Sequence, residues 1–317
     1  MDSIAERRRT SVKTAKPKRA GRKEQVQSYL MIAPQIIGFL VFSLYPIIWV
    51  LRYAWFDYNS VDAIFVGFDN FVRVFQDLSY WKSVANTFII SIGKLLIELP
   101  LALFLAVLLS DKVRGRSMFR LCFYVPNIIS VAIVGITFSY MFSSFDGIVN
   151  HLLQSMHLIS APINWFANKW TAIAVIMIAS IWQGFGVNMI YFMAGLMNVP
   201  EELYECSRLD GANKVQQFIH VTLPQLAPVA QIICMLAIVS GIKMNDLILV
   251  LTNGQPGGET EVVMSYILKQ FFAMNGGVSV EPQIGYACAV GVVTSIILAL
   301  ITVLYLRMSR KATSVNE

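Results

Sequence analysis

The sequence has little charge and none of the common motifs of catalytic centres. Of its 317 residues, 14% are charged and 56% are hydrophobic, and the mean hydropathy is +0.61. Soluble domains usually contain about 25% charged residues. No G-x-x-x-x-G-K-[ST] phosphate loop, H-E-x-x-H zinc motif or G-x-S-x-G nucleophile motif is present. The composition therefore indicates a membrane protein, and any nucleotide chemistry has to be supplied by a partner.

Cysteine and histidine are also scarce. The sequence holds four cysteines and three histidines, namely Cys122, Cys206, Cys234, Cys288, His151, His157 and His220. No C-x-x-C pair occurs, no histidine stands at ligand spacing, and the histidines fall in predicted loops. We predict no metal site and interpret the cysteines as packing residues in a reducing or lipid environment. A metal or redox role is the minor alternative.

Positive charge is concentrated at the N-terminus. The formal net charge is +6, and residues 1–27 are rich in Lys and Arg but poor in apolar side chains. This composition predicts a disordered basic tail, and its position gives no reason to expect nucleic-acid binding. The next apolar run is longer than the core of a signal peptide, which indicates an uncleaved transmembrane helix.

Apolar runs of spanning length recur along the chain, since about 20 apolar residues cross the hydrocarbon core. Six such runs lie at about 29–55, 83–109, 119–142, 170–197, 226–251 and 284–306. The predicted organisation is a basic tail at 1–27, a transmembrane domain at 28–309 with a polar loop at 198–225, and a second tail at 310–317.

The orientation follows from the loops. Lys and Arg gather in both tails and in the turn at 112–120, whereas residues 57–82 hold four aspartates. The positive-inside rule then places both termini and the polar loop in the cytoplasm. In the outer segment, Asp69 is expected to cap a short helix in which Phe71, Val74, Phe75 and Leu78 recur at helical spacing.

A polar segment at 198–228 separates two apolar runs. Pro200 suits the first position of a helix, and Glu201, Glu202 and Glu205 place negative charge near the positive end of its dipole. A short helix is therefore predicted at about 200–209. It is too polar to cross a bilayer.

The end of this helix is marked by Gly211, which supplies a left-handed stop. Asn213, with Gln216 three residues later, has the form of a capping box that opens a second short helix. Pro224 then ends the polar segment and admits the next span. The alternative is that the whole segment is only a polar connector between spans.

From Glu205 the segment has the spacing E-C-S-x3-G-x9-V-x-L-P. This spacing resembles the cytoplasmic EAA loop of permease subunits in bacterial binding-protein-dependent ABC importers. Cys206 and Ser207 replace two alanines of that motif, and Val221 replaces an isoleucine. In that family the loop is a coupling helix that docks into the ATP-hydrolysing subunit, and the resemblance implies the same role here. The residues expected to couple are Glu201, Glu202, Glu205, Arg208, Asp210, Gly211, Leu223 and Pro224.

Four further stretches resemble carbohydrate-type importer permeases. They are FVGFDNFVRVF, SVANTF, FRLCFYVPNIIS and LTNGQPGGETEVV, which begin at Phe65, Ser83, Phe119 and Leu251. The resemblance covers about 33–306 and implies an all-α membrane protein, a six-transmembrane-helix type I permease with a cytoplasmic coupling helix and both termini cytoplasmic. It places the chain in the bacterial cytoplasmic membrane.

The resemblance also implies partners. These are a second homologous permease subunit, a nucleotide-binding ATPase dimer that carries MgATP, an extracytoplasmic solute-binding protein, and a sugar or oligosaccharide substrate in a lipid bilayer. No cofactor on this chain, no enzyme activity of its own and no nucleic-acid partner is expected.

Polar residues inside spans are candidates for the transport path, because they are costly in lipid. Lys94 and Glu98, four residues apart, are predicted to pair on one helix face and to fix packing. Lys243 and Asp246, three residues apart with Asn245 beside them, could form a second pair.

Two stretches inside spans have the character of a sugar path: SIWQGFGVNMIY from Ser180 and AIVSGIKMND from Ala237. Sugars stack their C–H faces on aromatic rings, and their hydroxyls need paired donors and acceptors. The resemblance to maltose-type importers implies contacts at or near Ser180, Gly184, Val187, Asn188, Ser240 and Gly241. The full predicted path is Ser180, Trp182, Gln183, Gly184, Val187, Asn188, Tyr191, Ser240, Gly241, Lys243, Asn245 and Asp246. Glycines that only pack helices, together with a buried ion pair, are the alternative interpretation.

Two other functional classes are a secondary transporter and a membrane enzyme. An ion- or proton-driven secondary transporter would use Lys94, Glu98, Lys243 and Asp246 as a relay, but such carriers usually contain an internal repeat. The two halves of this sequence show no convincing similarity. A membrane enzyme would need a catalytic constellation, and no recognisable one is present.

Overall fold

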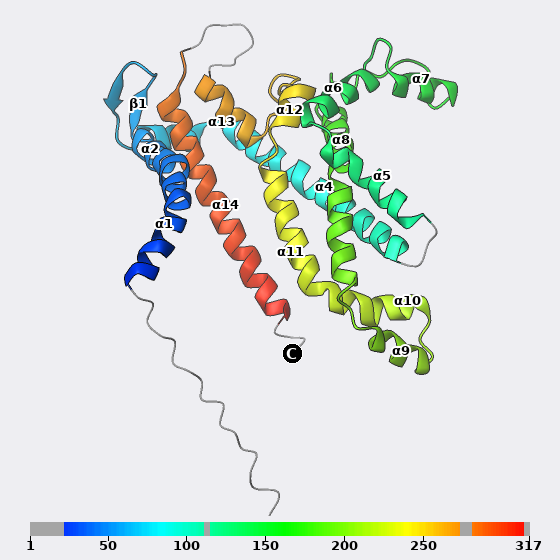
Figure 1. The fold of residues 1–317 in the computed structure, drawn as a ribbon. Helices are drawn as coiled ribbons and strands as arrows, with labels where there is room; N and C mark the ends of the chain where they lie inside the picture. The colour runs from blue at the N-terminus through cyan, green and yellow to red at the C-terminus, as the bar shows by residue number, and fades with distance from the viewer. Residues whose placement is uncertain (1–21, 111–114, 273–280, 314–317) are drawn as a thin grey trace, which may run out of the picture. The chain divides into compact units, whose positions relative to one another are not determined.

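The computed structural model describes residues 22–110, 115–272 and 281–313 (Figure 1). These residues form two units, one up to Arg52 and one from Tyr53 onward. Of the predicted basic tail, 1–21 lie outside the described residues, and 22–27 are helical rather than disordered. The second tail is likewise shorter than predicted, because the last helix continues to Thr313.

The described residues are almost entirely helical. In chain order the elements are α1 (Arg22–Phe39), the π-helical η1 (Leu40–Leu44), α2 (Tyr45–Tyr53), β1 (Phe56–Tyr58), β2 (Ala63–Phe65), α3 (Asp69–Gln76), α4 (Leu78–Ser110), α5 (Arg116–Ile128), α6 (Val131–Met141), α7 (Ile148–Ser155), α8 (Lys169–Leu196), α9 (Glu201–Leu209), α10 (Lys214–Gln217), the π-helical η2 (Phe218–Thr222), α11 (Leu223–Ile242), α12 (Asp246–Leu251), α13 (Val263–Phe272) and α14 (Ile284–Thr313).

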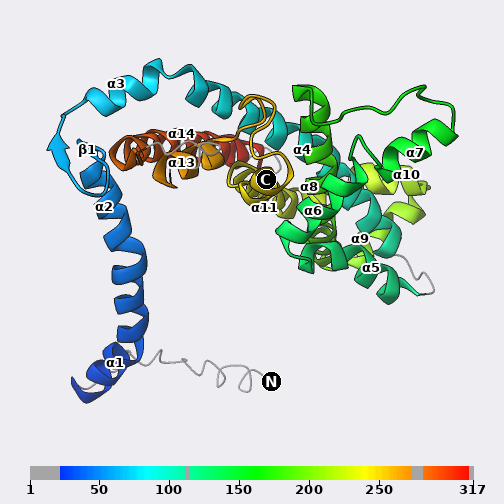
Figure 2. The same cartoon turned by 90° about the horizontal axis from the view of Figure 1, so that it is seen from above.

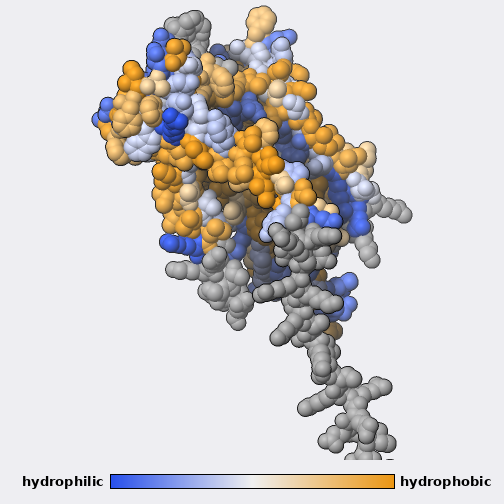
Figure 3. All heavy atoms as spheres, turned by 60° about the vertical axis from the view of Figure 1, so that its left-hand side comes forward, coloured by the Kyte–Doolittle hydropathy of each residue, from blue (hydrophilic) through white to orange (hydrophobic). Residues whose placement is uncertain are grey.

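Five helical segments are long and apolar enough to cross a membrane, within the part of the chain that the structure describes. They are Tyr29–Tyr53, Leu78–Ser110, Lys169–Leu196, Lys214–Ile242 and Ile284–Arg307, and the bent pair α5–α6 makes a sixth if it counts as one span. Large apolar side chains on these helices face outward, and Leu96, Phe104 and Leu300 are 66%, 64% and 60% exposed. Figure 3 shows hydrophobic side chains spread over the visible surface, as expected of a surface in contact with lipid.

The predicted third span is not one straight helix. α5 and α6 meet at an angle of 94°. Ile129 (φ −68°, ψ 136°) and Ser130 (φ −54°, ψ 134°) are extended, so the helix is interrupted for two residues shortly after Pro126. The predicted span at 119–142 is thus a bent pair of helices, a feature that apolar composition alone does not report.

The predicted fifth span is shifted toward the N-terminus. α10, η2 and α11 form one continuous apolar helix, Lys214–Ile242, so the second short helix of the polar loop is its first turn and not a separate element. Pro224 has no N–H to donate to a preceding carbonyl, and the wider turn of η2 directly before α11 accommodates it. The span ends at Ile242, and 246–251 belong to the separate helix α12.

The all-α prediction missed a short antiparallel hairpin. β1 and β2 pair Phe56 with Phe65 and Tyr58 with Ala63. The Asn59 side chain forms the turn, because its Oδ1 accepts the backbone N–H groups of Val61 at 3.1 Å and Asp62 at 2.8 Å.

Helix α3 forms in the predicted segment, but it ends at Gln76, so Leu78 belongs to α4, and Asp69 does not cap it. The N-cap is Phe68, which makes no side-chain cap hydrogen bond, and Asp69 lies in the first turn. The element is instead anchored by Asn70, whose side-chain amide donates to the carbonyls of Ala54 at 3.1 Å and Phe56 at 2.9 Å.

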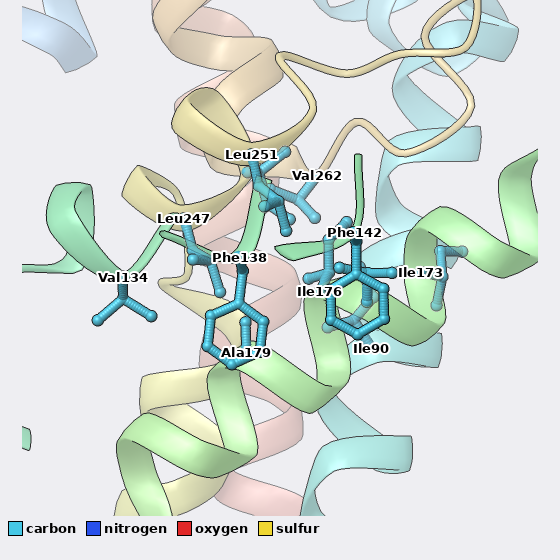
Figure 4. Close-up of a cluster of buried hydrophobic side chains, with 12 residues drawn as sticks. Ile90, Val134, Phe138, Phe142, Ile173, Ile176, Ala179, Leu247, Leu251 and Val262 are labelled. Atoms are coloured by element: carbon cyan, nitrogen blue, oxygen red, sulfur yellow. The ribbon is translucent and has the colours of Figure 1, made fainter. Parts of the chain in front are cut away.

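The main buried core lies among α4, α6, α8 and α12 (Figure 4). Phe138 and Phe142 stack with their ring centroids 6.1 Å apart, next to Ile176 of α8 and Leu247 of α12. A second cluster joins α4 and α8 to α11 nearer to α9, through Ala102, Ala106, Leu109, Met189, Phe192, Met193 and Ile233. Helix α4 therefore supports α8 along its length.

At the end of the bundle opposite α9, a polar cluster ties α4 to α13 and α14. The Asp77 carboxylate accepts hydrogen bonds from the hydroxyls of Tyr266 and Tyr286 and from the backbone N–H of Ser79 at 2.9 Å. The Arg73 guanidinium lies 4.1 Å from the centre of the Tyr286 ring. Burial by itself would raise the pKa of Asp77, but these donated hydrogen bonds outweigh it and hold the pKa below its ordinary value.

We expect Asp77→Asn to lower the thermal unfolding temperature at neutral pH, because two tyrosine hydroxyls lose a charged acceptor. Since the folded pKa is lowered, the stabilisation is fully present above the unfolded pKa and is lost as the pH falls through the folded pKa. The gap between wild type and variant should therefore be constant from about pH 7 to 5 and close below about pH 4. Unfolding in detergent across this range measures it. The same substitution at Asp57, which is exposed, is the control, and a gap that persists at low pH would contradict the assignment.

Candidate functional site

Helix α9 protrudes from the end of the bundle with no buried residue. It begins at Glu201, one residue later than predicted, and Pro200 is its N-cap. Glu201 and Glu202 lie in its first turn and Arg208 in its last, so its charges complement the helix dipole. Leu209 is 88% exposed. An element with this much free surface, including an apolar tip, has the properties of a docking element.

The turn after α9 has the predicted geometry. Gly211 has φ +79°, a conformation that favours glycine, and its surroundings are open. The capping box is present: Gln216 N–H donates to Asn213 Oδ1 at 2.9 Å, and Asn213 N–H donates to Gln216 Oε1 at 2.8 Å. Both predictions are confirmed.

Contacts with the start of the fifth span hold α9 in place. The Tyr204 hydroxyl lies 2.9 Å from Thr222 Oγ1, and Thr222 is buried. The Gln217 side chain donates to the carbonyl of Ala212 at 3.2 Å. Movement of α9 is thereby linked to η2 and α11, and through the residues before Pro200 to the end of α8.

The other predicted coupling residues surround this connection. Glu205 and Asp210 are exposed, as are Leu223 and Pro224 at the start of α11. On the inner side of α9, a groove runs between Tyr204 and Arg208 on one side and the ends of α4 and α8 on the other. Glu201 borders this groove, whereas Glu205 and Asp210 lie outside it and are exposed.

Inside the bundle, Glu98 of α4 is the centre of a buried polar cluster. The residue is 2% exposed, and its Oε2 lies 3.4 Å from Lys94 Nζ. Asn188 of α8 donates to Glu98 Oε1 at 2.6 Å. The predicted Lys94–Glu98 pair is confirmed, and the structure adds a partner that the sequence had placed on the cargo path. A buried carboxylate needs such partners, because an unpaired charge is very unfavourable in an apolar interior.

Gly184 makes room for this cluster. A Cβ atom at position 184 would lie 2.7 Å from Glu98 Oε1, closer than van der Waals contact permits. Gly241 of α11 has a similar relation to α4, because a Cβ there would lie 2.9 Å from Ser91 Oγ. In this structure both glycines serve the close approach of helices to α4.

The predicted path residues of α8 lie on different faces. Ser180, Gly184, Val187, Asn188 and Tyr191 share one face, because each lies three or four residues from another member of the set. Ser180 is buried and donates to the carbonyl of Met177 at 3.0 Å. Val187 is half-buried, whereas Tyr191 is exposed.

Trp182 and Gln183 contact the third span, on either side of the bend between α5 and α6. The rings of Trp182 and Phe138 are 5.7 Å apart. The Gln183 side chain donates to the carbonyl of Ile129 at 3.0 Å, at the point where the helix is interrupted. Gln183 thus satisfies a backbone group that the bend leaves without a helical partner.

The second predicted ion pair does not form. Lys243 and Asp246 are both exposed and make no ion pair with each other in the described structure. The reason is that α11 ends at Ile242 and α12 begins at Asp246, so the two residues do not share a helix. The Asn245 side chain donates to Asp246 Oδ1 at 3.3 Å. Ser240, in the last turn of α11, is exposed.

Sequence reasoning missed how the loop at 252–262 is held. Asn86 of α4 donates to the carbonyls of Glu259 at 2.7 Å and Glu261 at 2.9 Å. Glu261 also pairs with Lys269 at 2.9 Å. Asn86 lies in the stretch SVANTF, so a polar residue within an apolar span was the available signal.

The cysteines and histidines differ in burial and in the elements that hold them. Cys288 is buried and Cys234 half-buried, but Cys122 and Cys206 are exposed, so packing accounts for only part of the set. Two histidines lie in helices instead of loops, His151 in α7 and His220 in η2. Across 22–110, 115–272 and 281–313, no three His, Cys, Asp or Glu side chains are grouped closely enough to hold a metal ion.

Comparison with known proteins identifies similar chains. Residues 98–313 match the family model described as "Binding-protein-dependent transport system inner membrane component". The arabinooligosaccharides transport system permease protein AraP of Bacillus subtilis is 32% identical over 284 residues, which are 89% of this chain and 88% of AraP. The lactose transport system permease protein LacF of Rhizobium radiobacter is 30% identical and covers 90% of this chain and 95% of its own length. A chain of a bacterial ABC transporter involved in import of the acidic polysaccharide alginate has the same fold, with a TM-score of 0.79, 24% identity and coverage of 91% and 96%.

The contact between Gly184 and Glu98 can be tested by substitution. We expect Gly184→Ala to destabilise the protein by about 1–3 kcal/mol, because the new methyl group displaces a carboxylate held by two partners. Gly291→Ala in α14 is the matched control, since a Cβ there meets no atom within 4 Å. The free energy of unfolding of this variant should be no lower than that of the wild type.

A double-mutant cycle makes this prediction sharper. Asn188→Leu should cost less in the Gly184→Ala background than in wild type, because the hydrogen bond to Glu98 is already displaced. Thermal or denaturant unfolding of the four variants in detergent measures the coupling. Strictly additive effects would show that Gly184 and Asn188 do not act through the same carboxylate.

Proposed function

This chain belongs to the family of binding-protein-dependent transport system inner membrane components, and we propose that it is a permease subunit of an ATP-driven ABC importer for a sugar or oligosaccharide. The observation that carries the proposal is α9, a polar helix without buried residues. It lies between α8 and the fifth span and is held by the hydrogen bond between Tyr204 and Thr222. Relatives named as permeases for arabinooligosaccharides, lactose and trehalose or maltose support the class of cargo.

In this proposal the chain crosses the cytoplasmic membrane six times, with α5 and α6 together as the third span. Both termini and α9 are cytoplasmic, in agreement with the Lys and Arg content of the tails. ATP is bound and hydrolysed by a separate ATPase dimer, and an extracytoplasmic solute-binding protein delivers the cargo.

Coupling runs through the polar loop. Closure of the ATPase dimer moves α9, with Glu201, Glu202, Glu205, Arg208 and Asp210 as its contact surface. Gly211 aims the helix, and the contact between Tyr204 and Thr222 passes the movement to the fifth span. Because α9 also follows α8 after a connection of only four residues, both spans that bear the predicted path are displaced together.

A second permease subunit completes the transport path. Ser240, Lys243 and Asp246 are exposed at the surface of a bundle whose spans are otherwise apolar, and charged groups there are unfavourable against lipid. A homologous subunit that covers this surface would enclose them in an aqueous path, together with Tyr191 of α8. Asn188 and Gly184 are packed on α4, so they reach cargo only if α8 separates from α4.

The coupling role is tested in the reconstituted importer with its binding protein. We expect Glu205→Lys to reduce cargo-stimulated ATP hydrolysis by about tenfold, which corresponds to a loss of about 1.4 kcal/mol. Gly211→Pro should do the same by redirecting α9, because proline cannot adopt φ +79°. Basal ATP hydrolysis and cargo uptake are measured in parallel.

Asp57→Lys is the control for the charge reversal, since Asp57 is an exposed carboxylate in the hairpin and lies outside the polar loop at 198–225. It should retain stimulated hydrolysis. If Glu205→Lys and Gly211→Pro retain normal stimulation in an assembled complex, α9 is not the coupling element.

A further inference from the structure

Helix α7 lies at the side of the bundle, at the level where α8 begins (Figures 1 and 2). It follows the end of α6 by a short turn and runs across the direction of the long helices instead of along it. A helix in this position lies near the plane of a membrane surface and not through the membrane.

The orientation of α7 is fixed by its own polar contacts. Asn150 is 3% exposed, and its amide donates to the carbonyls of Ser143 at 3.1 Å and Ile163 at 3.0 Å. Its Oδ1 accepts the backbone N–H of Ile163 at 3.2 Å and the Trp165 indole N–H at 3.1 Å. The neighbouring Val149 packs against the main buried core. One face of α7 is therefore held against the bundle.

A second face of α7 is apolar and uncovered. Ile148, Leu152 and Met156 follow one another at intervals of four residues, which places them in one stripe. They are 67%, 57% and 60% exposed, and Phe145 in the turn before the helix is 97% exposed. A third face carries His151, which lies 2.8 Å from Asp146, and both side chains are exposed. The helix thus has a bundle side, an apolar side and a polar side.

The surroundings of the apolar stripe indicate lipid as its occupant. Tyr140 near the end of α6 and Trp170 at the start of α8 are 75% and 62% exposed, and tyrosine and tryptophan are the residues that gather at membrane–water boundaries. Ile133 and Ile136 of α6 are exposed as well, so the stripe adjoins elements that already present apolar side chains outward. A helix with separate apolar and polar faces at this level has the character of an interfacial amphipathic helix.

We propose that α7 is a lipid-surface element that lies in the membrane–water interface, with Ile148, Leu152 and Met156 immersed among the acyl chains and His151 and Asp146 in water. The helix thereby fixes the depth of α6 and α8 in the bilayer. This role of α7 involves neither the transported cargo nor coupling to an ATPase, so it can be tested independently of the proposed function.

The test places spin labels at two adjacent positions, Leu152→Cys and His151→Cys, in a background in which the four native cysteines are replaced by serine. The full-length protein, in its purified assembly, is reconstituted in vesicles of phosphatidylethanolamine and phosphatidylglycerol. Collision with oxygen, which concentrates in lipid, is compared with collision with a water-soluble nickel complex. We expect the oxygen-to-nickel ratio to be several-fold higher at Leu152 than at His151.

A second pair of variants tests the same positions if the protein without its native cysteines does not fold. Leu152→Trp and His151→Trp retain all native cysteines, and vesicles with brominated acyl chains should quench the added fluorescence at 152 more strongly than at 151. Similar nickel access at both labels would overturn the proposal in favour of a water-exposed stripe. Exclusion of both reagents at Leu152 would also overturn it, because a protein surface then covers the stripe; if this exclusion requires added solute-binding protein, that protein is the occupant.

Discussion

The arrangement of the bundle depends on the burial of one carboxylate. Glu98 lies deep between α4 and α8, where a charge without partners is not tolerated. Lys94 on the same helix balances it, and Asn188 reaches it from the other helix. These partners fix both the separation and the register of α4 and α8. Because Gly184 leaves the space that the carboxylate occupies, the constraint is set by the absence of a side chain as much as by the hydrogen bonds.

This contact positions the elements at both ends of the two helices. At one end α8 leads into α9 after four residues, so the register of α8 sets where α9 projects from the bundle. At the other end α4 begins beside Asp77, whose carboxylate gathers hydroxyl groups from α13 and α14. A rigid α4–α8 pair is therefore suited to carry a displacement of α9 through the bundle, since the intervening contacts are short and paired.

Local signals in the sequence predicted the polar loop well, because they depend on residues close together in the chain. Gly211 can adopt a positive φ because it has no side chain, and the reciprocal hydrogen bonds of Asn213 and Gln216 need only these two neighbouring residues. The bend at Ile129 did not follow, since it needs Gln183 from another helix to satisfy a free carbonyl. Nor did the link between Asn188 and Glu98, which joins residues 90 positions apart. Apolar composition located the spans but could not show where η2 or the end at Ile242 shifts their limits.

Small residues show which separations an opening movement has to make. Gly93 of α4 faces Met177 of α8, Gly184 faces Glu98, and Gly241 of α11 faces Ser91. α4 is therefore the common support against which α8 and α11 both pack closely. Of the residues predicted for the cargo path, Gly184, Asn188 and Gly241 lie at these contacts, whereas Tyr191, Ser240, Lys243 and Asp246 are exposed. If the first three are to contact cargo, α4 has to move relative to α8 and α11. In the transport cycle proposed above, the glycines that serve packing in this structure would then be the places where a path opens, because packed helices shift between discrete arrangements.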